Sequence, residues 1–289
     1  RAFSLMVRSR RHLCTHKPQE MATLVRSRRH LCTHKPQEMA TLMQVHATQG
    51  GDGPWRAAGF DVDSDGLVGL GGVGLSVAEN SSEDDDDDDS TWWTWRHSAL
   101  NESETSAVQA AVDGIATVLV DDSAYSAMHA HRPHANGADR IHSITLTTPD
   151  LHRTVGAFED LGVLPQKTEV LSSKLSMAFF KLDAPGGPVV VEVVAPSAAR
   201  LSAPATGPAI ELPGFPPLST DPANPARIVG MVLSVPSLDA LRSVLGEAAV
   251  GKARPAMQGG GRMIMPLQAS LGLPLTLAFM TPLTEPKTG

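Results

Sequence analysis

Hydrophobic and polar positions repeat one pattern twice in the C-terminal half of the chain. Residues 144–158 read ITLTTPDLHRTVGAF, and residues 231–245 read MVLSVPSLDALRSVL. Each copy is an alternating apolar segment, then a proline, then an amphipathic stretch typical of a helix. In the first copy Leu151, Val155 and Phe158 share one helical face. The repeated order predicts two similar modules that make one domain.

Each module is predicted to continue with further strands. In the first, the pattern predicts a strand, a helix and two strands at 141–147, 150–161, 176–182 and 189–194. The turn-forming sequence PGGP at 185–188 joins the last two. The second module repeats this order at 228–235, 237–245, 262–267 and 275–280. The Pro- and Ala-rich residues 197–225 are predicted to link the modules.

The region before the modules, residues 44–138, has no sustained periodicity. It contains six consecutive aspartates at 84–89, whose mutual repulsion favours a solvated chain. We therefore expect a mostly disordered acidic linker, with 103–120 forming a helix or a helix followed by a strand. Trp92, Trp93 and Trp95 would pack against the domain or clamp a partner. His129, His131 and His134 are expected to be solvated loop residues.

The first 42 residues differ in charge from the rest. The 18-residue sequence VRSRRHLCTHKPQEMATL occurs at 7–24 and again, unchanged, at 25–42. This segment holds nine Lys or Arg and two Glu, a balance of +7. An Arg-rich, acid-poor segment is typical of a transit peptide, so residues 1–43 would direct the protein to a mitochondrion or plastid. The alternative is a basic tail on a cytoplasmic protein.

The remaining residues are acidic, and their composition excludes several classes of function. They carry fifteen basic and 29 acidic side chains, a balance of −14 that repels nucleic-acid phosphates. Both cysteines, Cys14 and Cys32, lie in the basic segment, which rules out a thiolate metal site elsewhere. No apolar run reaches 18 residues, so no membrane span is predicted.

The C-terminal half resembles the glyoxalase-like domains of the vicinal oxygen chelate superfamily, which includes glyoxalases, bleomycin-resistance proteins and dioxygenases. The phrases that carry the resemblance are ITLTTPDLHRTVGAFEDLGV, MAFFKLDAPGGPVVVEVVAP, RIVGMVLSVPSLDALRSVLGE and GGGRMIMPLQASLGLPLTLAFMTP. The resemblance implies an α+β fold in which two paired βαβββ modules form curved mixed sheets around a cup. That domain would span 139–284, with modules at 139–198 and 226–284, behind a largely disordered N-terminal region.

In metal-dependent members of the superfamily, each module supplies a His or Gln from its first strand and a Glu from its last. Counted from the flanking prolines, the equivalent positions here are Ser143, Glu192, Gly230 and Ala278. Only Glu192 has a metal-ligating side chain. A register slip to His142 would aim that side chain away from the cup, because strand neighbours point to opposite faces. The metal site is thus predicted to be degenerate. No cofactor is predicted, although binding of a divalent metal is left as an alternative.

A catalytic and a binding interpretation remain. Glu192 lies between Val190 and Val194 on one strand face, where desolvation suits a general base in a lyase or isomerase. It could equally be a strand Glu that reaches solvent or pairs with a cation. The cup would hold a small organic carbonyl or carboxylate ligand, with the candidate contacts Lys181, Arg262, Met231, Met263 and Met280. The alternative is a non-catalytic binding or sequestering module; a homodimer is also left open.

Overall fold

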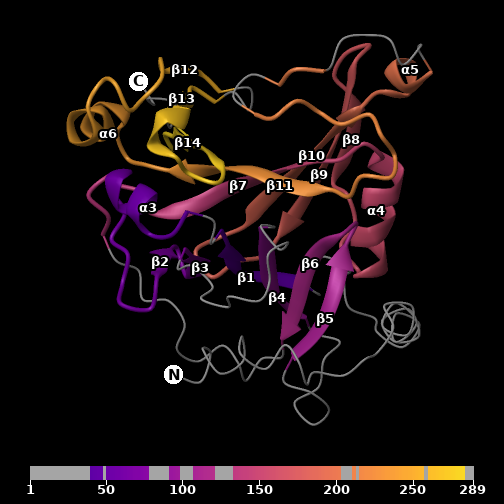
Figure 1. Cartoon of the computed structure of the whole chain (residues 1–289), viewed down its shortest axis with the longest axis horizontal. Helices are drawn as coiled ribbons and strands as arrows, with labels where there is room; N and C mark the ends of the chain where they lie inside the picture. Colours follow the sequence, from indigo (N-terminus) through magenta and orange to yellow (C-terminus); the bar gives the residue numbers. More distant parts are fainter. Residues whose placement is uncertain are drawn as a thin grey trace, which may run out of the picture.

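Two mixed β-sheets, of six and eight strands, make up the two layers of the molecule (Figure 1). The computed structural model describes residues 40–47, 50–77, 91–97, 107–120, 133–202, 210–212, 215–256 and 260–283. The predicted α+β class is confirmed. Residues 1–39, the aspartate run, His129 and His131 lie outside the described residues. None of the helices in the described part is long and apolar enough to cross a membrane.

The eight-stranded sheet contains the two predicted modules. The first consists of β7 (Arg140–Thr147), α4 (Leu151–Asp160), β8 (Lys167–Val170), β9 (Leu175–Leu182) and β10 (Val189–Pro196). The second consists of β11 (Arg227–Ser234), α6 (Leu238–Leu245), β12 (Arg254–Pro255), β13 (Met263–Pro266) and β14 (Thr276–Met280). In each module the last strand runs parallel to the first. The two first strands, β7 and β11, pair antiparallel at the centre of the sheet.

Both module helices begin with the same capping device. The Asp150 carboxylate accepts a hydrogen bond from the Arg153 amide at 3.0 Å, and the Ser237 hydroxyl accepts one from the Ala240 amide at 3.2 Å. A capping oxygen satisfies an amide that has no partner inside the helix. Pro149 and Pro236 directly precede these caps and disfavour a helical conformation in the residue before them. The repeated proline therefore marks where each helix starts.

The six-stranded sheet is formed by a region that the sequence predicted to be a disordered linker. Its elements are β1 (Ala40–His46), α3 (Gly53–Ala57), β2 (Leu67–Leu70), β3 (Val73–Ser76), β4 (Trp92–His97), β5 (Ala107–Val112) and β6 (Ile115–Val120). For these residues the linker prediction is wrong. Residues 107–120, expected to be helical in part, form a β-hairpin. β1 begins inside the second copy of the duplicated 18-residue segment, so the basic segment does not end at residue 43 as a separate unit.

The pairing in the six-stranded sheet follows the same plan as the eight-stranded sheet. β3 runs parallel to β1, β6 runs parallel to β4, and β1 and β4 pair antiparallel at the centre. The order β2-β3-β1-β4-β6-β5 has three strands on each side where the larger sheet has four. The described residues thus contain a second, smaller pair of modules.

One hydrophobic core joins the two layers, with α4 between them. Phe158 of α4 lies with its ring centroid 4.1 Å from that of Phe180 on β9. On its other side it contacts Trp93 and Trp95 of β4, at 6.1 and 5.8 Å. Both tryptophans are fully buried. The prediction that the tryptophan cluster packs against the domain is confirmed for these two residues.

A second link between the layers is polar. Asp113, in the β5–β6 turn, accepts hydrogen bonds from Arg153 and Thr154 of α4 and, at 3.2 Å, from Thr148. Arg153 also donates to the backbone carbonyls of Pro222 and, at 2.6 Å, Asn224 in the linker between the modules. The Asp113 side chain is only 5% exposed. This cluster fixes the hairpin, the helix and the linker to one another.

Candidate functional site

The eight-stranded sheet has one face in the core and one face turned away from the six-stranded sheet. Ile144, Leu146, Val191 and Val193 are fully buried in the shared core. Successive strand residues point to opposite faces, so the residues between them point outward. In Figure 1 the strands β12–β13 and β8–β9 rise on either side of the central strands β7 and β11. We call the face between them the cup face.

The four metal-ligand-equivalent positions all lie on the cup face. Glu192 pairs with Thr145, and Thr145 pairs with Gly230, which makes one row across three strands. Ser143 and Ala278 both pair with Val232 in the adjacent row. Paired residues share a face of a sheet. The sequence prediction therefore located positions that the fold does bring together.

The side chains at these positions do not suit a divalent metal. Besides Glu192 they offer one hydroxyl, from Ser143, since Gly230 and Ala278 have no ligating group. Nor does any group of three His, Cys, Asp or Glu side chains elsewhere in the described chain have metal-site geometry. Divalent ions in enzymes are held by several carboxylate or imidazole donors. No reaction step through a metal follows from this donor set.

The linker between the modules packs directly against Gly230. A Cβ atom at this position would lie 2.6 Å from Cε1 of Phe215 and 2.7 Å from the carbonyl oxygen of Thr276. Only glycine lets the aromatic ring and the neighbouring backbone approach this closely. The linker residue Phe215 therefore covers the position from which a relative with a metal would supply its second His or Gln.

His142 lies on the cup side, contrary to the sequence prediction. Val232 pairs with Ser143, but the next residue, Leu233, pairs with Ile141, so β7 carries one extra residue here. Such a β-bulge breaks the strict alternation of faces. His142 Nε2 lies 3.4 Å from Nη1 of Arg262, the residue before β13. The alternating spacing of Arg140 and His142 was a signal that these two side chains share a face.

The electrostatic surroundings of His142 are cationic. Burial, together with the smaller effects of the Arg262 and Arg140 charges, lowers the pKa of His142 from 6.5 to about 4. His142 is therefore neutral at pH 7. Arg140 donates from Nε to the Ser234 hydroxyl at 3.4 Å and from Nη1 to the Gly186 carbonyl at 3.4 Å. Within the described chain neither arginine has a carboxylate within 4.0 Å.

The remaining predicted ligand contacts divide between the two faces. Lys181 is exposed and pairs with Val190, which places it on the cup face. Met280 pairs with Ile264 and also faces this side, although it is 1% exposed. Met231 pairs with Ile144 and lies in the core, and Met263 packs against the core. A methionine-lined cup is therefore not formed, because alternation directs Met231 and Met263 away from it.

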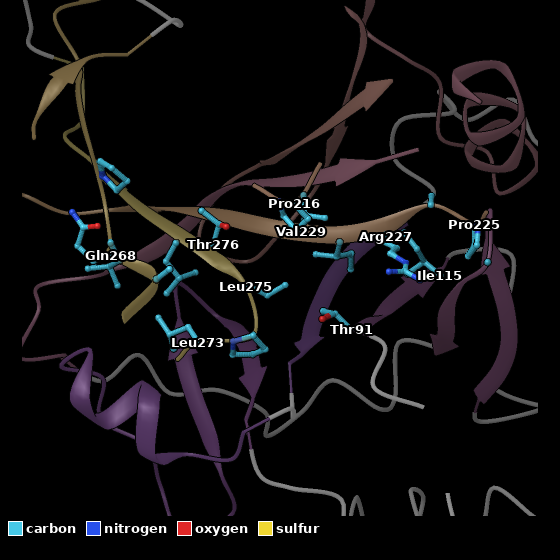
Figure 2. A pocket seen from close by; sticks show the side chains of 18 residues that line it. Thr91, Ile115, Pro216, Pro225, Arg227, Val229, Gln268, Leu273, Leu275 and Thr276 are labelled. Carbon is cyan, nitrogen blue, oxygen red and sulfur yellow. The ribbon is translucent and has the colours of Figure 1, made fainter. Parts of the chain in front are cut away.

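A pocket of about 740 Å³ lies at the other end of β11 from His142. In Figure 2 its lining side chains follow β11 from Pro225 and Arg227 to Thr276 and Gln268. The described lining residues include one charged side chain, Arg227, and no His, Asp, Glu or Cys. Thr276 pairs with Gly230, so the pocket reaches the edge of the row that contains Glu192. The pocket offers apolar contact area but no acid–base chemistry.

Comparisons with known proteins agree with this architecture. No family model matches the chain, and no curated protein matches it. Among solved structures, a mutant of 4-hydroxymandelate synthase from Streptomyces coelicolor aligns with a TM-score of 0.54 at 12% identity, covering 87% of this chain and 95% of the other. This chain has the vicinal oxygen chelate fold.

Smaller proteins with the vicinal oxygen chelate fold align with about half of the chain. Methylmalonyl-CoA epimerase from Streptomyces coelicolor, bound to 2-nitronate-propionyl-CoA, matches 51% of this chain and 99% of its own, at 16% identity and a TM-score of 0.35. The hypothetical protein BH1468 from Bacillus halodurans matches 52% of this chain at 12% identity, with a TM-score of 0.34. At these identities the likeness concerns the fold alone.

Proposed function

We propose that this protein binds a small organic ligand with a carbonyl or carboxylate group on the cup face, without a metal ion. The supporting observation is that Ser143, Glu192, Gly230 and Ala278 share this face while only Glu192 can ligate a metal. The four positions still lie together, but they lack the side chains that would hold a metal. A ligand on this face would therefore be held by direct contacts with protein groups. Lys181 and Arg262 supply cations for such contacts.

A lyase or isomerase reaction at a carbonyl-adjacent C–H bond is the second candidate. It is favoured by the half-buried Glu192, which lies on the cup face in the same row as Thr145. The carboxylate would accept the proton, and the electron pair of the C–H bond would move onto the carbonyl oxygen. A neighbouring cation such as Lys181 would have to stabilise the resulting charge.

The two candidates separate in one set of measurements on the full chain. Bound metal is determined by elemental analysis. The melting temperature is then measured with pyruvate and with the glutathione adduct of methylglyoxal, before and after treatment of the protein with EDTA. We expect ligand-dependent stabilisation that EDTA leaves unchanged. Turnover of the adduct is assayed in the same samples, and turnover that Glu192→Gln abolishes would support the enzyme. Stoichiometric bound metal would contradict binding without a metal.

A steric variant tests whether binding occurs on the cup face. Val232 is half-buried between Ser143 and Ala278, so Val232→Phe fills the space above this row. We expect the stabilisation by ligand to be lost. The matched control is Val170→Phe on β8, where the side chain is 72% exposed and far from this row in the strand order. Equal stabilisation of both variants would place the ligand elsewhere.

A further inference from the structure

We propose that Arg140, His142 and Arg262 form a recognition site for the carboxylate of the bound ligand, at the bulged end of the cup face. The proposal rests on the proposed function and names the chemistry of its ligand. The three residues come from the start of β7 and from the residue before β13. These segments are 120 residues apart in sequence, and His142 and Arg262 are in contact at 3.4 Å.

The contact between Arg262 and His142 fixes the position of the imidazole proton. An arginine can only donate hydrogen bonds, so His142 Nε2 must be the acceptor. A neutral imidazole with an accepting Nε2 carries its proton on Nδ1. His142 Nδ1 is therefore a hydrogen-bond donor. It is buried and has no partner.

Arg262 and the neighbour of His142 in sequence each carry a further buried polar atom without a partner. Arg262 Nε is buried without an acceptor, and so is the hydroxyl of Ser143, which is 0% exposed and follows His142 directly. A buried polar group without a partner is rare and costs stability in a folded protein. All three atoms can donate a hydrogen bond, so a ligand that supplies acceptor oxygens would satisfy them together.

The local charge points to an anion. The charges of Arg140 and Arg262 both lower the pKa of His142. Within the described residues no carboxylate forms an ion pair with either guanidinium. Two like charges close together are unfavourable until an opposite charge joins them. A carboxylate provides both a negative charge and four lone-pair directions for donors. It therefore fits the charge and the three unpartnered donors at once.

The test follows the His142 ring resonances by NMR in the full chain. The probes are pyruvate, its neutral analogue pyruvamide, and inorganic phosphate. We expect pyruvate to shift the His142 resonances and pyruvamide to leave them in place. Phosphate binding as tightly as pyruvate would contradict recognition of a carboxylate as such, and it would identify a general oxyanion site instead.

Variants assign the effect to the arginines. We expect Arg262→Gln and Arg140→Gln each to weaken pyruvate binding by about tenfold or more, because each removes a charge-assisted hydrogen bond. The control is Arg56→Gln in α3, an arginine paired with Asp52 in the smaller sheet's part of the chain, which should change the affinity less than twofold. The melting temperature of each ligand-free variant reports whether it folds.

The outcomes distinguish this proposal from the proposed function. If Val232→Phe blocks pyruvate binding while Arg262→Gln and Arg140→Gln bind it like the wild type, the carboxylate site is wrong and the binding function stands. If neutral pyruvamide stabilises the protein as much as pyruvate does, the carboxylate site again fails alone. If neither ligand binds, both proposals fail.

Discussion

Asp113 shows how much of this architecture depends on single polar side chains. It has a positive φ of 50°, which Asp and Asn tolerate better than most residues, and it binds three side-chain donors from the neighbouring layer. The change Asp113→Asn preserves the backbone conformation but leaves Arg153 without its counter-charge.

We predict that Asp113→Asn lowers the free energy of unfolding by about 2–3 kcal/mol, since it leaves a partly buried charge unpaired. Urea denaturation measures this change. Asp239→Asn is the control, because its carboxylate is 94% exposed and its pairing with Arg242 contributes at most about 0.5 kcal/mol. Equal losses in the two variants would show that the Asp113 cluster does not link the layers.

His142 predicts a specific dependence of stability on pH. Its pKa is about 4 in the folded chain and 6.5 in the unfolded chain. Between these values the unfolded state binds a proton that the folded state does not, so the free energy of unfolding falls as the pH decreases from 6.5 to 4. His142→Gln should remove this part of the slope. Parallel curves for variant and wild type, measured by urea denaturation from pH 4 to 7, would contradict the buried neutral histidine.

Another histidine shows why single residues are hard to place from sequence. His134 was expected to be solvated, yet it is 6% exposed, accepts a hydrogen bond from the Asp61 amide and bonds the Gly69 carbonyl. Both partners lie more than 60 positions away in sequence. No local pattern reports such a contact. The same holds for His142, whose direction depends on a bulge set by the partner strand.

At the scale of elements, the sequence predicted those strands and helices that combine strong periodicity with a proline boundary. β7, α4, β9, β10, β11 and α6 lie within one or two residues of their predicted bounds. β8 and β12 were missed because they are short, largely exposed edge strands of four and two residues. The six-stranded sheet was missed because acidic and glycine-rich segments interrupt its short strands.

The close approach of the linker to β11 gives a prediction about packing. Gly230→Ala should destabilise the protein by about 1–3 kcal/mol, because the new methyl group meets Phe215 and the Thr276 carbonyl. Gly156→Ala in α4 meets no atom within 4 Å and should be neutral or stabilising by up to about 1 kcal/mol. Urea denaturation of both variants tests the contact, and a neutral Gly230→Ala would refute it.

At the scale of the whole molecule, the two sheets share one core instead of forming separate domains. Leu42 donates from its amide to the Asp183 carbonyl at 2.8 Å, and Phe60 stacks on Phe279, so contacts cross the layers at several places. A domain boundary near residue 138, expected from composition, does not interrupt this core. Charge and hydrophobic periodicity are properties of single segments of the sequence. The packing of one sheet on the other depends on contacts between residues distant in sequence, so these properties do not predict it.

A shared core predicts one cooperative unfolding transition. Tryptophan fluorescence reports on the smaller sheet through Trp93 and Trp95, and the His142 resonances report on the larger one. We expect both signals to change with the same urea midpoint, and the calorimetric and van't Hoff enthalpies to agree. Two separated midpoints would mean that the sheets unfold independently.

The central claim is that the cup face binds its ligand without a metal. Calorimetric titration of the full chain with pyruvate, first with EDTA and then with excess Mn²⁺, tests it most directly. The predicted result is the same dissociation constant and one binding site under both conditions. Binding that appears only with Mn²⁺ would contradict the claim, because a metal ion would then be needed to hold the ligand.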